Sequence, residues 1–153
     1  MGHGGQLTCF SCGYSQEVFF GIGFAHCGAF EVLADNETVS FSRRLRACIP
    51  NRTERNLVID LLKNKNGAAL AYGYGLYRCP KCGKFHNKFH YQIKHDGGMY
   101  EPEYECGKCA VKLDYLGDEA ENEAGTGQID VSKYQCPKCG AHELILGGGI
   151  MWD

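Results

Sequence analysis

The chain has 153 residues, with ten cysteines, 21 glycines and a formal net charge of −2 at pH 7. This length suits one domain or two small modules that share a surface, and the slightly acidic charge argues against a generic nucleic-acid-binding protein. No apolar run is long enough to cross a membrane and no secretory leader is evident, so we expect a cytoplasmic protein without membrane contact. In a reducing compartment, clustered cysteines bind metal more often than they form disulfides.

The amino-terminal part of the chain, residues 1–28, is expected to be a short module around one cysteine pair. Its first six residues are rich in glycine, and we expect them to be mobile. Cys9 and Cys12 follow with two residues between them, and the β-branched and aromatic side chains of 17–24 predict a strand. Cys27 has no cysteine at this spacing, and we interpret it as a buried free thiol.

A helical and strand-forming insert is expected over residues 29–76. The second half of 30–46 can be helical, and it contains a cluster of arginines. This cluster is either a solvated helix face or a surface that binds anions or RNA. Arg43, Arg44 and Arg46 belong to it, and Arg52 and Arg55 complete the crowded stretch of thirteen residues. Cys48 follows without a near partner, and we interpret it as structural.

The clearest helix is predicted over 54–64, where apolar residues recur at helical spacing. Thr53 is in position to cap its first turn, and Asn66-Gly67 is in position to end it. Residues 68–78 alternate large apolar residues with small ones. This period of two predicts a strand that leads into the next cysteine pair.

Residues 77–116 form the most informative segment of the sequence. Two cysteine pairs, separated by 23 residues, frame it: Cys79 with Cys82, and Cys106 with Cys109. The residues between the pairs alternate between apolar and polar and contain Asp96-Gly97-Gly98. This pattern predicts a hairpin with strands over 85–94 and 99–104.

One face of this hairpin is polar and basic. Together with the arginine cluster it makes a possible nucleic-acid-binding surface; the plainer interpretation is a solvated polar face. The hairpin residues of this surface are Lys84, His86, Lys88, His90 and Lys94. Three lysines neutralise few phosphates, so we expect weak binding of nucleic acid or none.

The rest of the chain is expected to hold an acidic loop and a second terminal module. Residues 113–130 contain six acidic residues and no basic one, so 117–129 is expected to be a flexible loop. The module 130–153 contains the fourth pair, Cys136 and Cys139. It ends on apolar residues around three glycines, which indicates a docked chain end.

Eight of the ten cysteines fall in four Cys-x-x-Cys pairs, which predicts two four-sulfur sites and two Zn²⁺ ions per chain. Redox disulfides of thioredoxin type are the alternative, but that motif normally occurs once. We expect a nested arrangement, in which the second and third pairs form one site and the first and fourth form the other. The second and third pairs are separated by a short loop, and closing a short loop costs less entropy. The sites are then Cys79, Cys82, Cys106 and Cys109, and Cys9, Cys12, Cys136 and Cys139. A crossed arrangement, which joins the first pair to the third and the second to the fourth, stays open.

A metal ion held by four thiolates has no open coordination position, so a structural role is expected. The sequence contains no phosphate-binding glycine loop and no seryl nucleophile motif. We therefore expect no catalytic residues, no small-molecule substrate and no enzymatic activity.

The paired turns and the hairpin between them resemble zinc ribbons, which implies a metal and a fold more firmly than a function. The turns Cys9-Phe10-Ser11-Cys12-Gly13-Tyr14 and Cys136-Pro137-Lys138-Cys139-Gly140-Ala141 also resemble those of rubredoxins, which transfer electrons with one iron. The 123 residues between these turns depart from the short rubredoxin chain. The whole pattern, with Gly21-Ile22-Gly23-Phe24, is similar to a group of small bacterial zinc-ribbon proteins of Firmicutes type. This resemblance implies no particular activity.

These patterns together predict an α+β fold of small zinc-ribbon hairpins with one or two helices in the middle. The expected function is a zinc-binding adaptor module for a protein partner. A nucleic-acid-binding zinc ribbon is the first alternative, and an iron electron-transfer protein of rubredoxin type is the second.

Overall fold

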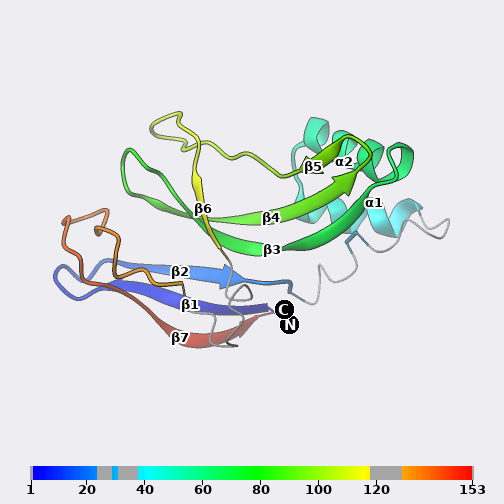
Figure 1. Cartoon of the computed structure of the whole chain (residues 1–153). Coiled ribbons are helices and arrows are strands. Elements are labelled where there is room, and N and C mark those ends of the chain that lie inside the picture. The colour runs from blue at the N-terminus through cyan, green and yellow to red at the C-terminus, as the bar shows by residue number, and fades with distance from the viewer. Residues whose placement is uncertain (1, 24–28, 31–37, 118–128, 153) are drawn as a thin grey trace.

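The fold is α+β and rich in strands, as expected (Figure 1). The computed structural model describes residues 2–23, 29–30, 38–117 and 129–152. Over these residues, two helices accompany seven strands that pair antiparallel in two sheets. None of the helices in these ranges is both long and apolar enough to cross a membrane. The expected flexible loop, apart from its ends, and Cys27 lie outside the described residues.

The terminal sheet joins the two ends of the chain. Its strands are ordered β2 (Ser15–Phe20), β1 (Gly2–Cys9) and β7 (Leu144–Trp152). The expectation that the first six residues are mobile is wrong, because β1 pairs along both of its edges. Gly5 packs closely against β7: a Cβ there would lie 3.1 Å from the carbonyl oxygen of Gly147, which is tighter than ordinary van der Waals contact. The glycines are thus part of close strand packing.

The central sheet has the order β5 (Gly98–Tyr100), β4 (Phe85–His95), β3 (Ala68–Arg78) and β6 (Asp114–Gly117). The predicted bounds of β3 are confirmed. The return strand of the hairpin is shorter than expected, and Pro102 is buried just beyond its end. Proline has no backbone N–H to donate to a neighbouring strand, which fits its place outside the sheet.

The two sheets repeat one connection pattern. In each, a hairpin is formed across a cysteine pair, as β1–β2 and as β3–β4. A second cysteine pair then precedes a strand that pairs with the other edge of the first hairpin strand, as β7 does with β1 and β6 with β3. The central sheet lies, in sequence, entirely between β2 and β7.

Two helices pack at the end of the central sheet that is distant from the cysteine turns. Helix α1 spans Thr38–Cys48 and α2 spans Arg52–Asn64, which confirms both predicted helices. The cap of α2 is Asn51 and not Thr53: its Oδ1 accepts from the amides of Thr53 and Glu54 at 2.9 and 3.1 Å. The apolar face of α2 joins one hydrophobic core with strand β4, made of Val58, Leu61, Leu62, Phe89, Tyr91 and Ile93.

The two sheets are joined by a second core and by backbone contacts. The core contains side chains of both sheets: Leu7, Val18, Phe20 and Leu144 from the terminal sheet, and Leu76 and Phe85 from the central one. Gly21 and Tyr74 exchange two backbone hydrogen bonds, of 3.0 and 2.7 Å. Asn87 adds a side-chain link, because its Oδ1 accepts from the Phe19 amide and its Nδ2 donates to the carbonyls of Phe19 and Gly75.

Replacing Asn87 with alanine should lower the free energy of unfolding by about 2 kcal/mol, because it removes three side-chain hydrogen bonds to the backbone of Phe19 and Gly75. Urea unfolding followed by circular dichroism measures the change. Asn64→Ala is the matched control, since Asn64 is exposed and its side chain donates a hydrogen bond to Asp60 on the same helix, and it should shift stability by no more than about 0.5 kcal/mol. Equal effects of the two changes would show that Asn87 does not hold the sheets together.

Candidate metal centres

Eight cysteine sulfurs come together in two groups of four, each of which could hold a metal ion. One group is Cys9, Cys12, Cys136 and Cys139, and the other is Cys79, Cys82, Cys106 and Cys109. The sulfurs within each group all lie within 4.8 Å of one another. This is the nested arrangement of the pairs. In the part of the chain that the structure describes, these are the only such groups of cysteine, histidine and carboxylate ligands.

The sulfur spacing matches a tetrahedral ion site. Three pairs of sulfurs are 3.7, 3.7 and 3.8 Å apart: Cys9 with Cys139, Cys12 with Cys136, and Cys82 with Cys106. A regular tetrahedron whose centre lies about 2.3 Å from each corner, the usual zinc–sulfur distance, has edges of about 3.8 Å. The spacing is therefore that of sulfurs around one small ion.

Four turns of one design present these sulfurs. In the turn of Cys79, the Cys79 amide donates to the Lys84 carbonyl and the Gly83 amide donates to the Cys79 carbonyl, both at 2.9 Å. The turns of Cys9, Cys106 and Cys136 repeat both bonds with their own residues. The residue after the second cysteine has positive φ in every turn. It is glycine in three of them, but in the third turn along the chain it is Ala110, at φ 49°.

Backbone amides also reach the sulfurs directly. The Cys82 amide donates to Cys79 Sγ and the Lys138 amide to Cys136 Sγ, both at 3.4 Å. Such bonds favour the thiolate, and second-shell donors of this kind orient metal ligands. Burial raises the pKa of the Cys136 thiol, but the amides of Cys139 and Lys138 outweigh it and the pKa is about 7. This thiol ionises readily, as a metal ligand must.

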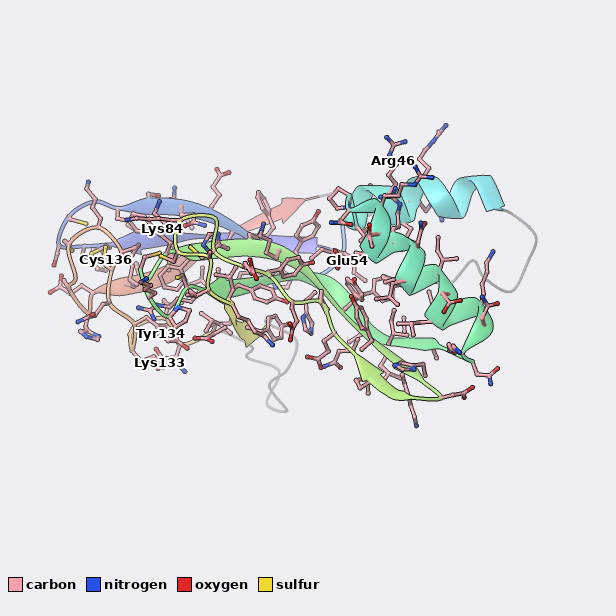
Figure 2. All side chains as sticks on the ribbon, turned by 90° about the horizontal axis from the view of Figure 1, so that it is seen from above. Arg46, Glu54, Lys84, Lys133, Tyr134 and Cys136 are labelled. Carbon is pink, nitrogen blue, oxygen red and sulfur yellow. The ribbon has the colours of Figure 1, made fainter. Side chains whose placement is uncertain are left out.

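The metal centres and the helices occupy opposite ends of the molecule (Figure 2). Cys136 lies near Lys84 and Tyr134 at one end, and Arg46 of α1 lies at the other. Between the sheets at the cysteine end, the guanidinium of Arg78 is 5.1 Å from the ring centre of Tyr134 and 5.9 Å from that of Phe85. Sequence reasoning missed this contact, since nothing in the spacing of these residues brings them together.

The polar hairpin face predicted from the sequence is not one basic surface. His90 is buried, its Nδ1 lies 2.7 Å from the Tyr77 hydroxyl, and its ring stacks on Tyr115 with 3.9 Å between ring centroids. Its expected place on a solvated face is therefore wrong: the short strand β6 brings Tyr115 over that side of the sheet. The pKa of His86 is lowered by burial and by Lys88 and Lys84, so it carries little charge at pH 7.

The basic residues that stay exposed are divided between distant places. Lys84 and Lys94 lie near opposite ends of β4, and the Lys88 ammonium lies 5.7 Å from the ring centre of Tyr104. The arginine cluster is exposed on α1, at the helical end (Figure 2). The structure therefore does not bring the predicted binding residues together.

Cys48 stands apart from both sulfur groups. It is buried in the core between the helices and the central sheet, and burial raises the pKa of its thiol to about 12. This fits the interpretation of Cys48 as a structural side chain. A hollow lies beside Cys48 and is lined by carboxylates of α2 and of the segment before Cys106. Sequence analysis did not predict this hollow, because the glutamates that line it are far apart in the sequence.

No family model, no curated protein and no solved structure matches the chain.

Replacing Ala110 with glycine should raise the free energy of unfolding by about 0.5–1 kcal/mol, because glycine adopts positive φ without the Cβ penalty. The reverse change, Gly140→Ala, should lower it by about 1 kcal/mol. A Cβ on Gly140 meets nothing within 4 Å, so this variant tests backbone strain alone. Urea unfolding of the metal-loaded protein measures both, and shifts of the same sign would contradict the strain argument.

Proposed function

We propose that the chain is a structural zinc protein that holds two Zn²⁺ ions and serves as a docking module for a protein partner in the cytoplasm. The two four-sulfur groups are the observation that carries the proposal. Zinc in an all-thiolate site stabilises a fold without doing chemistry, because no coordination position is left for water or substrate. The two sheets then act as zinc-ribbon hairpins, each closed by one ion.

Zinc is preferred over iron because of the architecture around the sulfurs. Tetrahedral sulfur sites suit zinc or iron alike, so the ligands alone do not choose the metal. A rubredoxin-type role needs one iron near the surface as the working group. Here two sites of the same design each join the turn of a hairpin to the turn before a neighbouring strand of the same sheet, as a structural ion does. A non-catalytic role follows from the same closed ligand sets.

A protein partner is preferred over nucleic acid because of the charge distribution. Two zinc ions with four thiolates each carry a formal charge of −2 apiece, which offsets the lysines next to the cysteine turns. Those lysines are Lys81, Lys84, Lys108 and Lys138. Nucleic-acid binding requires a continuous positive surface, and the other basic residues of the predicted binding surface are divided between α1 and β4.

Protein purified without chelator or added metal should contain two zinc ions per chain and be colourless. Inductively coupled plasma mass spectrometry gives the metal content, and a visible absorption spectrum reveals iron in sulfur sites. Cys139→Ser should lower the content to about one ion, because it removes one of four ligands from one site. A red protein with iron as the main metal would reject the zinc assignment.

The control variant for this measurement is Cys48→Ala, which removes a thiol that belongs to neither group. It should retain both ions. Loss of an ion from this variant, or one ion or none in the wild type, would show that the two-site assignment is wrong.

The chain should bind single-stranded RNA weakly, with a logarithmic salt slope of about two, since three lysines neutralise few phosphates. Fluorescence anisotropy with a labelled 20-nucleotide RNA at low and physiological salt measures this. Metal-loaded protein should instead capture a protein from a nuclease-treated extract of its source cells, and chelation should abolish the capture. Tight RNA binding that persists at physiological salt, without a captured protein, would replace the docking proposal with the nucleic-acid one.

A further inference from the structure

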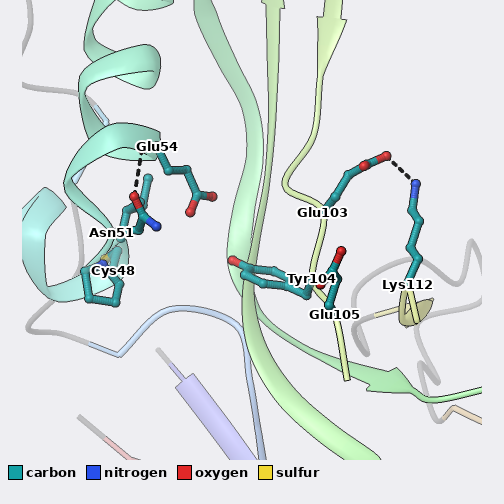
Figure 3. A pocket seen from close by; sticks show the side chains of 9 residues that line it. Cys48, Asn51, Glu54, Glu103, Tyr104, Glu105 and Lys112 are labelled. Carbon is teal, nitrogen blue, oxygen red and sulfur yellow. Dashed lines mark hydrogen bonds and ion pairs between the residues drawn. The ribbon is translucent and has the colours of Figure 1, made fainter. Parts of the chain in front are cut away.

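An acidic groove runs between the helices and the segment that leads into the third cysteine turn (Figure 3). It consists of two adjoining hollows of about 590 and 540 Å³. Both are lined by Asn51, Glu54 and Glu103, which makes them one continuous depression. In Figure 3, Cys48, Asn51 and Glu54 lie on one side and Tyr104 and Glu105 on the other, while the Glu103 carboxylate points outward to Lys112.

The charge of this groove is strongly one-sided. Four carboxylates line it, Glu54, Glu101, Glu103 and Glu105, against one basic side chain, Lys112. Lys112 forms an ion pair with Glu103, and both side chains are largely exposed, at 65% and 72%. An exposed pair of this kind contributes little energy, so an incoming cation can displace Lys112 from Glu103.

The walls between the carboxylates are aromatic and apolar. Tyr100 and Tyr104 are half-buried there, and Leu57 of α2 is 43% exposed in the second hollow. Burial and the nearby Glu54 raise the pKa of the hydroxyl of Tyr100, which agrees with a negative potential along the groove. Aromatic rings bordered by carboxylates suit the flat, weakly hydrated guanidinium group.

The arrangement does not suit a metal ion. Glu54 is held by the Tyr91 hydroxyl, which donates to its Oε1 at 2.6 Å. Among the described residues, no three carboxylate, histidine or cysteine ligands of this groove lie within 4.8 Å of one another. The carboxylates are spread along an elongated depression, so they fit several separate cations better than a single one.

We propose that this groove docks an extended segment of a partner protein that carries spaced arginine or lysine side chains. The inference rests on the proposed docking function and assigns the surface and the chemistry of the partner. The guanidinium groups pair with Glu103, Glu105 and Glu101 and lie against the tyrosine rings, while Leu57 contacts an apolar residue of the segment. One wall of the groove, Glu103–Glu105, leads directly into the turn of Cys106, so an ion in the central sulfur group would help to hold that wall in place.

The test is fluorescence anisotropy of a fluorescein-labelled octapeptide of alternating arginine and glycine, titrated with metal-loaded protein. The double variant Glu103→Gln with Glu105→Gln should weaken its binding about tenfold, because two partly exposed ion pairs are lost. The matched control is Glu17→Gln with Asp114→Asn, which changes the net charge equally at exposed positions outside the groove. It should change affinity less than twofold.

A second pair of variants tests the apolar contact without altering charge. Leu57→Ala should weaken binding about threefold. Leu70→Ala is its control, because Leu70 is 55% exposed on β3 and lines neither hollow, and it should bind like the wild type. Circular dichroism and zinc content of every variant confirm that the fold is intact.

Equal weakening by the groove and control variants would show non-specific charge attraction, and it would overturn the inference. Absence of wild-type binding would overturn it too. If the wild type binds no peptide but still captures a protein from the nuclease-treated extract, docking uses another surface and the proposed function stands. If it does neither, both proposals fail.

Discussion

The structure depends on bringing four sulfurs together at each of two points. Each group joins one turn at the head of a hairpin to a second turn from elsewhere in the chain. Four thiolates this close repel one another, so a bound cation would make this convergence favourable. The sheets around the sulfurs are small, and their apolar cores are shared with neighbouring elements and not complete within one sheet. An ion bound by each group would supply a closure that a core of this size does not.

The central sheet lies, in sequence, between strands of the terminal sheet, so the two sulfur groups close loops of very different length. In the central sheet 23 residues separate the two cysteine turns, whereas 123 separate those of the terminal sheet. The longer loop costs about 1.5 kcal/mol more to close. The central sheet can therefore assemble from local contacts, and the terminal sheet closes around it. The bridge between Gly21 and Tyr74 and the side chain of Asn87 then tie the two together.

Much of this organisation could be predicted from sequence, and the failures have physical causes. The strand β3 and the helix α2 follow from periodicity, and the cysteine groups follow from spacing. Residues 2–6 were misjudged because glycine content was taken as mobility, whereas they belong to β1, which pairs with a strand on each side and at Gly5 lies close to β7. His90 was misjudged because alternation along β4 does not show that β6 returns and buries that face. The acidic groove is formed by glutamates from different parts of the chain, so no local sequence pattern indicates it.

The pairing of β1 with β7 has a consequence for how this unit can be combined with other proteins. Gly2 and Trp152 are register partners on neighbouring strands, so their Cα atoms are about 5 Å apart. Two points this close can replace a single peptide link in the surface loop of a host protein without spreading the host's own backbone. The unit is thus suited to insertion as well as to end-to-end fusion. A host joined in this way would be attached at the end of the terminal sheet that is distant from the cysteine turns (Figure 1).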